Sequence, residues 1–118
     1  MMKCLVDVEY FKRQEFECKC GCGFGSREDD LMPAGLILAL DKIRLELQAP
    51  MPVNSGFRCY NHNVKVGGVK NSKHLAGRAA DVSCDNYAKL VSIAEKHKSI
   101  FGLKIIRYDS DRFLHIEV

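Results

Sequence analysis

The sequence lacks the long apolar segment that a membrane-spanning protein requires. None of its uninterrupted apolar runs approaches the roughly 20 residues of a transmembrane helix. The N-terminus carries one lysine followed by an acid, so no signal peptide is visible and we expect synthesis in the cytoplasm. Internal repeats and low-complexity tracts are also missing. We therefore expect a single domain over residues 1–118, with one modest core and no membrane insertion.

Signals for phosphate or nucleic-acid binding are weak. The glycine-rich stretch at Gly21, Gly23 and Gly25 has no following Lys-Ser/Thr, which argues against a phosphate-binding loop. The formal net charge of +3 is mild, and the basic residues form no stripe interleaved with aromatics. A small zinc-ribbon-like nucleic-acid binder is therefore the weakest hypothesis, and we expect no nucleic-acid partner.

Six cysteines are many for a chain of this length. Three of them, Cys18, Cys20 and Cys22, crowd one segment, and the other three are scattered. Without an export signal, reduced thiols are favoured over disulfides. Structural zinc sites commonly use cysteine pairs spaced by two to four residues, which the Cys-x-Cys-x-Cys pattern fits poorly. The pattern favours packing cysteines or one disulfide, and a structural zinc site is the minor alternative.

The clearest predicted helix has Pro33 in its first turn and ends at Pro50 and Pro52. Asp29 and Asp30 lie ahead of it, where acids suit the helix dipole. Its apolar residues recur at helical spacing and predict a core-facing stripe: Leu36, Leu40, Ile43 and Leu47.

The rest of the chain predicts short strands and one further helix. We expect a helix from an Asn86 cap to about His97, where the dipole suits a histidine. Residues 53–58 predict a short strand that runs into a turn, and a buried strand is expected to start at Asp81-Val82. Further strands are expected at 101–108 and 113–118, with a turn at 109–111 joining them. The predicted fold class is α+β, with a small, mostly antiparallel sheet and helices packed on one face.

A metal-binding pattern lies in the segment 72–81 and in the last strand. His74 and Asp81 are separated by six residues that include the small residues Gly77, Ala79 and Ala80, and His115 lies on the final strand. Alternation places His115 and Glu117 on one face of that strand and the aliphatic residues on the other. A catalytic zinc takes three histidine or carboxylate ligands and leaves one position open. We predict Zn2+ on His74, Asp81 and His115, with His62 as a competing ligand.

Arg58 follows a predicted strand and is a candidate binding residue. Its planar guanidinium can hold a carboxylate or a peptide carbonyl oxygen. Taken alone, Arg58 fits the interpretation of an ordinary surface arginine equally well.

Three blocks together resemble the M15 peptidases: residues 55–58 (SGFR), 72–81 (SKHLAGRAAD) and 115–117 (HIE). This family comprises zinc D-Ala-D-Ala carboxypeptidases and phage endolysins, and it shares a fold with the hedgehog signalling domain. The similarity spans roughly residues 10–118, and the Phe16-x-Cys18-x-Cys20 segment resembles short phage-encoded members. The resemblance implies that the three predicted ligands hold zinc, that Arg58 steadies the substrate, and that Ser72 contacts it.

The general base is where this sequence departs from the family pattern. The resemblance implies an acid a few residues before the last histidine, most often three, and Arg112 occupies that position. Asp111 is the nearest carboxylate and is our prediction, with Asp109 behind it. Glu117 is a further candidate, although its family counterpart is usually an aspartate with a supporting role.

The resemblance implies a zinc metallopeptidase that hydrolyses peptide bonds in bacterial peptidoglycan, as a carboxypeptidase or an endopeptidase. A phage-encoded lysin would lie in the host cytoplasm before release to the cell wall, or would be virion-associated. Its substrate would be the stem peptide, and we expect a monomer. The departure at Arg112 keeps one alternative open, a catalytically inactive zinc-binding structural or virion module of the same fold.

Overall fold

The computed structural model describes residues 8–118, so the predictions for the first residues and Cys4 lie outside the described part. The elements follow one another along the chain as short 3-10 helices (η), α-helices and strands. They are η1 (Arg13–Phe16), α1 (Ala34–Leu47), β1 (Val53–Ser55), α2 (Tyr60–Lys65), η2 (Lys73–Ala76), β2 (Ala79–Ser83), α3 (Tyr87–Phe101), β3 (Lys104–Tyr108) and β4 (Phe113–Glu117).

The strands form one sheet in the order β1-β2-β4-β3, and every neighbouring pair is antiparallel. The central pair, β2 and β4, aligns Asp81 with His115. The predicted β3–β4 hairpin is confirmed, with its tight turn between Tyr108 and Phe113. The predicted fold class, α+β with an antiparallel sheet, is therefore confirmed.

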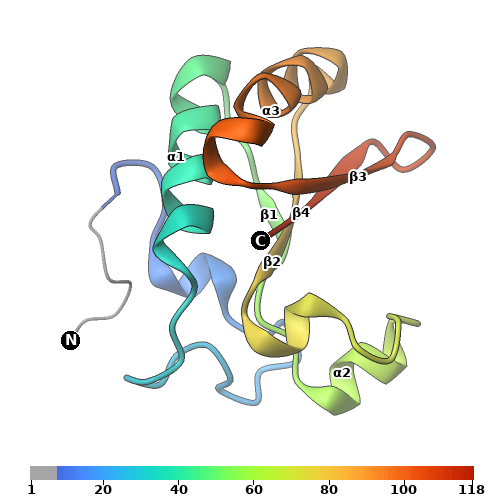
Figure 1. Ribbon diagram of the computed structural model, residues 1–118. Helices are drawn as coiled ribbons and strands as arrows, with labels where there is room; N and C mark the ends of the chain where they lie inside the picture. The colour runs from blue at the N-terminus through green and yellow to red at the C-terminus, as the bar shows by residue number, and fades with distance from the viewer. Residues whose placement is uncertain (1–7) are drawn as a thin grey trace.

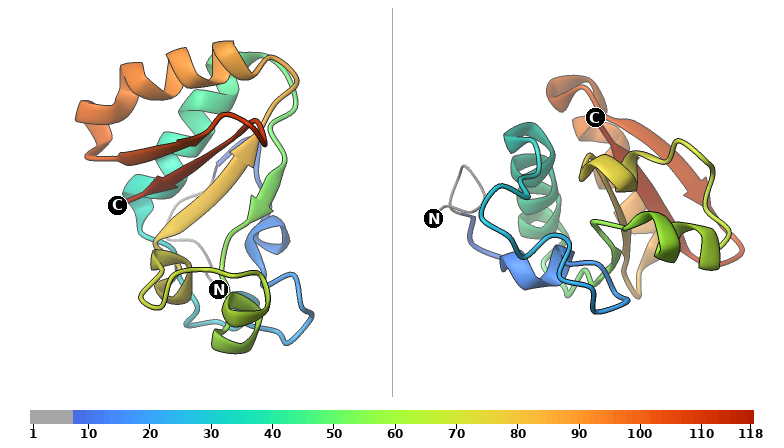
Figure 2. Two further views of the ribbon diagram at one scale, coloured as in Figure 1. Left: turned by 90° about the vertical axis from the view of Figure 1, so that its right-hand side faces the viewer. Right: turned by 90° about the horizontal axis from the view of Figure 1, so that it is seen from below.

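The two faces of the sheet have different surroundings. α1 and α3 pack against each other on one side of the sheet, and α2 lies on the other side (Figures 1 and 2). The strand residues that belong to the core are fully buried: Ala80, Val82, Leu114 and Ile116. The alternate residues Asp81 and His115 consequently point to the side of α2. Side-chain alternation in two central strands thus separates core from site.

Helix α1 has the predicted core-facing stripe, but its start differs from the prediction. Pro33 is the N-cap residue, and the first turn contains no acid. The carboxylate of Asp30 instead accepts hydrogen bonds from the backbone N–H of Gly25 at 2.8 Å and of Arg27 at 3.2 Å. The dipole interpretation of Asp29 and Asp30 is therefore wrong, because Asp30 organises the preceding loop.

Helix α3 begins as predicted and ends later. The Asn86 side chain accepts a hydrogen bond from the Lys89 N–H at 3.1 Å, and the helix runs to Phe101 before Gly102 turns left-handed at φ 66°. His97 therefore lies inside the helix, buried and bonded to Glu46 of α1. The predicted dipole role of His97 is wrong, because its partner is a carboxylate on the neighbouring helix.

The short strand predicted to run into a turn over 53–58 is confirmed, and it ends at Ser55. Gly56 lies so close to the backbone of η1 that a Cβ atom would come within 2.6 Å of the Phe16 carbonyl oxygen. Phe57 then donates its N–H to that same oxygen at 2.7 Å. This contact holds η1 against the segment that carries Arg58.

Residues 17–33 connect η1 to α1 without regular secondary structure. The cysteine prediction needs correction here, because Cys59, which is remote in sequence, joins the cluster of Cys18, Cys20 and Cys22. The cysteines of the described part are all free, so no disulfide forms there. Within residues 8–118, no helix has the length and apolar character to cross a bilayer.

Candidate metal centre

Asp81 and His115 face each other across the central strand pair. The Nδ1 atom of His115 lies 3.0 Å from Oδ1 of Asp81. Both residues are nearly buried, each about 9% exposed. Because they are register partners in the middle of the sheet, their separation is fixed by the strand ladder.

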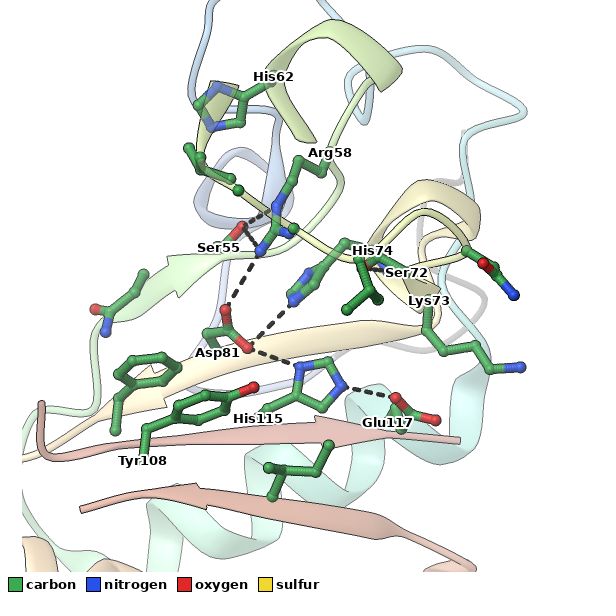
Figure 3. A pocket seen from close by; sticks show the side chains of 18 of the residues that line it. Ser55, Arg58, His62, Ser72, Lys73, His74, Asp81, Tyr108, His115 and Glu117 are labelled. Carbon is green, nitrogen blue, oxygen red and sulfur yellow. Dashed lines mark hydrogen bonds and ion pairs between the residues drawn. The ribbon is translucent and has the colours of Figure 1, made fainter. Parts of the chain in front are cut away.

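His74 reaches the same carboxylate from η2. Its Nε2 atom lies 3.1 Å from Oδ1 of Asp81, and Figure 3 shows the two imidazoles approaching this oxygen from different elements. Ser72 caps η2 by accepting the N–H of His74 at 3.1 Å, and Gly77 ends it in the left-handed conformation. The predicted site residue Ser72 therefore has a clear structural role in fixing His74, and it also lines the cleft.

The other nitrogen of each histidine is held by an acceptor. Nδ1 of His74 lies 2.7 Å from the carbonyl oxygen of Gly56, which can only accept, so this nitrogen carries a hydrogen. Nε2 of His115 lies 2.7 Å from a carboxylate oxygen of Glu117 and donates to it. These contacts leave Nε2 of His74 and Nδ1 of His115 to face Asp81. Partners of this kind orient histidine ligands in metal sites.

The donor set fits a zinc ion. Two imidazole nitrogens and one carboxylate oxygen lie within 4.8 Å of one another, and each would present a lone pair to the common centre. Such atoms require a positive group between them, either a proton or a cation. Two histidines and one carboxylate leave a fourth tetrahedral position open, as in catalytic zinc sites. The sequence prediction of His74, Asp81 and His115 thus names three residues that the fold brings together.

The charges of these groups are strongly coupled. Burial alone would raise the pKa of Asp81, but hydrogen bonds from His115 and His74 outweigh it and lower the pKa to about 2. Burial opposes protonation of His115, yet its hydrogen bonds to Asp81 and Glu117 prevail and raise its pKa. A proton and a metal ion therefore compete for the same position, and metal affinity should fall as the pH decreases.

Arg58 is buried next to this group and is not a surface residue. Its Nη1 donates to the Asn63 side chain at 2.8 Å, and its Nε and Nη2 donate to the Ser55 hydroxyl at 3.3 and 3.2 Å. Nη2 also lies 3.4 Å from the second oxygen of Asp81 (Figure 3). The guanidinium is thereby fixed at the edge of the candidate metal position. Asn63 was not predicted from the sequence, and only this contact with Arg58 identifies it as part of the site.

An open cleft of about 640 Å³ lies over the candidate ligands. Arg58, Lys73 and Lys104 add positive charge to its lining, and Tyr108 adds an aromatic ring. Lys104 and Tyr108 come from β3, on the same face as His115, so strand pairing alone brings them to the site. His62 lines the cleft but is not one of the three clustered ligands.

The predicted general base lies away from the cleft. Asp111 is exposed in the β3–β4 turn, and Asp109 accepts hydrogen bonds from Tyr87 and Arg107. Arg112 takes a left-handed conformation at φ 58° and donates to the carbonyl of Asp85. Among the described residues, Asp81 and Glu117 are the acids that line the cleft.

Fold and site together define an α+β protein in which two histidines and one aspartate converge as a candidate centre for one metal ion. The model of the peptidase M15 family matches residues 9–117, which is almost the whole chain. The chain therefore belongs to the peptidase M15 family, and the resemblance noted in the sequence is confirmed.

The known proteins that are similar to this chain include the following two. One is the zinc D-Ala-D-Ala carboxypeptidase of Streptomyces albus G, 40% identical over 50 residues, or 41% of this chain. The match covers 20% of that curated relative, so the chain spans about a fifth of its length. The other is the crystal structure of the Serratia marcescens L-Ala D-Glu endopeptidase ChiX. It matches with a TM-score of 0.56 and 18% identity over 74% of this chain and 80% of that one, and it supports the fold.

Proposed function

We propose that the protein is a zinc metallopeptidase that hydrolyses peptide bonds in bacterial peptidoglycan. The observation that carries this proposal is the convergence of His74, Asp81 and His115 beside a fixed arginine in an open cleft. Family membership supports a peptidase. The relatives, named for D-Ala-D-Ala and L-Ala-D-Glu cleavage, support a stem-peptide substrate.

The cleft residues suit an anionic peptide. A bound zinc ion would supply Lewis acidity and an activated water at the open coordination position. Arg58 is held by Ser55 and Asn63, so its charge can stabilise a developing oxyanion without rearrangement. Lys73 and Lys104 line the same cleft and can pair with carboxylates of a stem peptide.

Glu117 is better placed than Asp111 for proton management at this site. Its carboxylate accepts the Nε2 hydrogen of His115 and lines the cleft, whereas Asp111 does not line it. We infer that Glu117 orients His115 and increases its basicity, and that it is the carboxylate in reach when a proton must leave the cleft.

The test is the release of new amino groups from purified peptidoglycan. We expect the wild type to release amino groups. A chelator should abolish this release and added zinc should restore it, and the His74→Ala variant should show none. Chain folding of the variant is checked by circular dichroism. Zinc that is bound at His74, with no release from any wall chemotype, would overturn the peptidase proposal and favour an inactive zinc-binding module.

The biological setting of a phage-encoded lysin or virion peptidase belongs to the same proposal. Its support is the Phe16-x-Cys18-x-Cys20 segment, which resembles short phage-encoded members. The products would separate the two activities. Free D-alanine indicates a carboxypeptidase, and new termini within the stem peptide indicate an endopeptidase.

A further inference from the structure

A second group of potential metal ligands lies outside the cleft. The Sγ atoms of Cys18, Cys20, Cys22 and Cys59 all lie within 4.8 Å of one another. Three come from the loop after η1, and Cys59 comes from the segment between β1 and α2. We propose that these four cysteines bind a structural zinc ion, independently of the peptidase site.

The sulfur–sulfur distances match a tetrahedral site. Cys18 and Cys20 are separated by 3.5 Å, and Cys20 and Cys59 by 3.7 Å. Four thiolates about 2.3 Å from a zinc ion would lie about 3.8 Å from one another. A disulfide would require about 2.05 Å. The observed spacing is therefore that of ligands around a common centre.

The loop backbone explains how alternate cysteines can surround one ion. In an extended strand, residues 18, 20 and 22 would lie in a row on one face and could not enclose a metal. Gly21 and Gly23 have φ values of 83° and 93°, and Cys18 donates its N–H to the Phe24 carbonyl at 2.8 Å. Residues that carry a side chain rarely adopt such positive φ values. The two glycines therefore allow the loop to curl around its thiols.

Backbone N–H groups are directed at two of the sulfurs. Cys59 donates its N–H to Sγ of Cys18 at 3.4 Å, and His62 donates its N–H to Sγ of Cys59 at 3.4 Å. Donors of this kind stabilise sulfur that carries negative charge. Cys20 and Cys22 are exposed, so a metal ion can enter from solvent.

The site would be structural, because four cysteine ligands fill a tetrahedral zinc and leave no open position. It would close the loop onto the chain 41 residues further on, at Cys59. Cys59 directly follows Arg58, so the zinc would anchor the segment that positions the cleft arginine. In a reducing compartment a metal can do this where a disulfide would not persist.

The first experiment counts zinc per chain in the purified full-length protein. We expect two zinc ions in the wild type, one in His74→Ala and one in Cys20→Ser/Cys22→Ser. Cys84→Ala is the matched control, because Cys84 is buried outside the cluster and the count should stay at two. A single zinc in the wild type that His74→Ala removes would overturn the proposal, even if the peptidase proposal holds.

The second measurement needs no cysteine variant, and its wild-type arm does not depend on the folding of any variant. Cobalt-substituted wild type and His74→Ala should both show intense thiolate-to-metal charge-transfer bands in the near ultraviolet. In the zinc form, four thiols should resist a thiol reagent until a chelator is added. Absence of these bands, a reactivity that ignores the chelator, or a disulfide between these cysteines in a peptide map would each overturn the proposal.

Discussion

At the residue scale, the site depends on which nitrogen of each histidine is free. The Gly56 carbonyl accepts the hydrogen on Nδ1 of His74, and the Glu117 carboxylate accepts the hydrogen on Nε2 of His115. The other nitrogen of each ring is thereby left free to face the metal position. A histidine that rotated or changed tautomer would present N–H instead of a lone pair to the metal. The partners of His74 and His115 are therefore as important to the site as the ligands.

Replacing Glu117 by Gln is the direct test of this arrangement. We expect a loss of about 10- to 100-fold in zinc affinity or activity, since the amide accepts the His115 hydrogen more weakly than a carboxylate does. Affinity is measured by chelator competition and activity by amino-group release across pH. A shift of the pH profile would separate a role in proton management from a purely positional one.

Asp111→Asn is the matched control for Glu117→Gln, because it removes the carboxylate that sequence reasoning favoured. We expect its zinc affinity and rate to equal those of the wild type, since Asp111 is exposed in the hairpin turn and does not line the cleft. If Asp111→Asn abolished activity and Glu117→Gln retained it, Asp111 in the hairpin turn would be the general base.

The sequence alone predicts the three residues that cluster at the candidate metal site, but it does not show how the predicted general base lies relative to them. Histidine and aspartate in a spaced pattern carry their own chemical signal, and alternation places His115 on an open face. The base depends on where a hairpin turn points, and the left-handed turn residue Arg112 directs that turn away from the cleft. Asn63 and Tyr108 were missed because nothing local distinguishes them from ordinary helix and strand residues.

At the element scale, η2 is held in place by contact with an aromatic ring. Gly77 ends η2 at φ 69°, and a Cβ atom there would come within 2.3 Å of the Phe57 ring. Phe57 is buried, so it cannot move aside freely. The position of His74 thus depends on a glycine three residues later.

Gly77→Ala should therefore destabilise the fold and weaken metal binding. Gly67→Ala is its matched control, with φ 74° but no atom within 4 Å of the added Cβ. We expect the control to cost about 1–2 kcal/mol from its left-handed backbone, and Gly77→Ala to cost roughly 1–3 kcal/mol more from the clash. Urea unfolding measures both, and equal losses would show that the Phe57 contact is unimportant.

The pair of long helices is joined by a polar contact whose stability depends on pH. Hydrogen bonds from Lys96 and then His97 lower the pKa of Glu46 below its ordinary value of 4.5. The ionised form is thus favoured in the folded state. The contribution of Glu46 to stability is fully present above the ordinary pKa and is lost as the pH falls through the lowered one.

Glu46→Gln should lower the free energy of unfolding at neutral pH, with a difference from wild type that disappears in acid. Chemical unfolding at several pH values measures this. Glu95→Gln is the control, because Glu95 is exposed on α3 and has no ion pair among residues 8–118. A difference for Glu46→Gln that stays constant down to acid pH would contradict the assignment.

At the scale of the whole molecule, the sheet divides the protein into a structural layer and a cleft layer. Its two edges are β1, which is three residues long, and β3, which carries Lys104 and Arg107. Short or charged edge strands resist pairing with another chain. We therefore predict a monomer, with a mass of 13.3 kDa by light scattering.

The edge charge itself can be tested. Arg107→Val should increase association at high concentration, because it removes a charge from the exposed edge strand and adds a β-branched residue. A wild-type protein with twice the monomer mass would contradict the prediction and would locate an interface elsewhere on the surface.

The sequence by itself determined the features that a local pattern encodes: the two long helices, the terminal hairpin, and the candidate ligands His74, Asp81 and His115. Periodicity and residue chemistry involve only a few neighbouring positions, so they can be recognised in the sequence without knowledge of the fold. Only the tertiary structure decided which distant groups meet. It brought Gly56 to His74, Cys59 to the cysteine loop, and His97 to Glu46, because strand register and helix packing set distances between segments that no local pattern encodes.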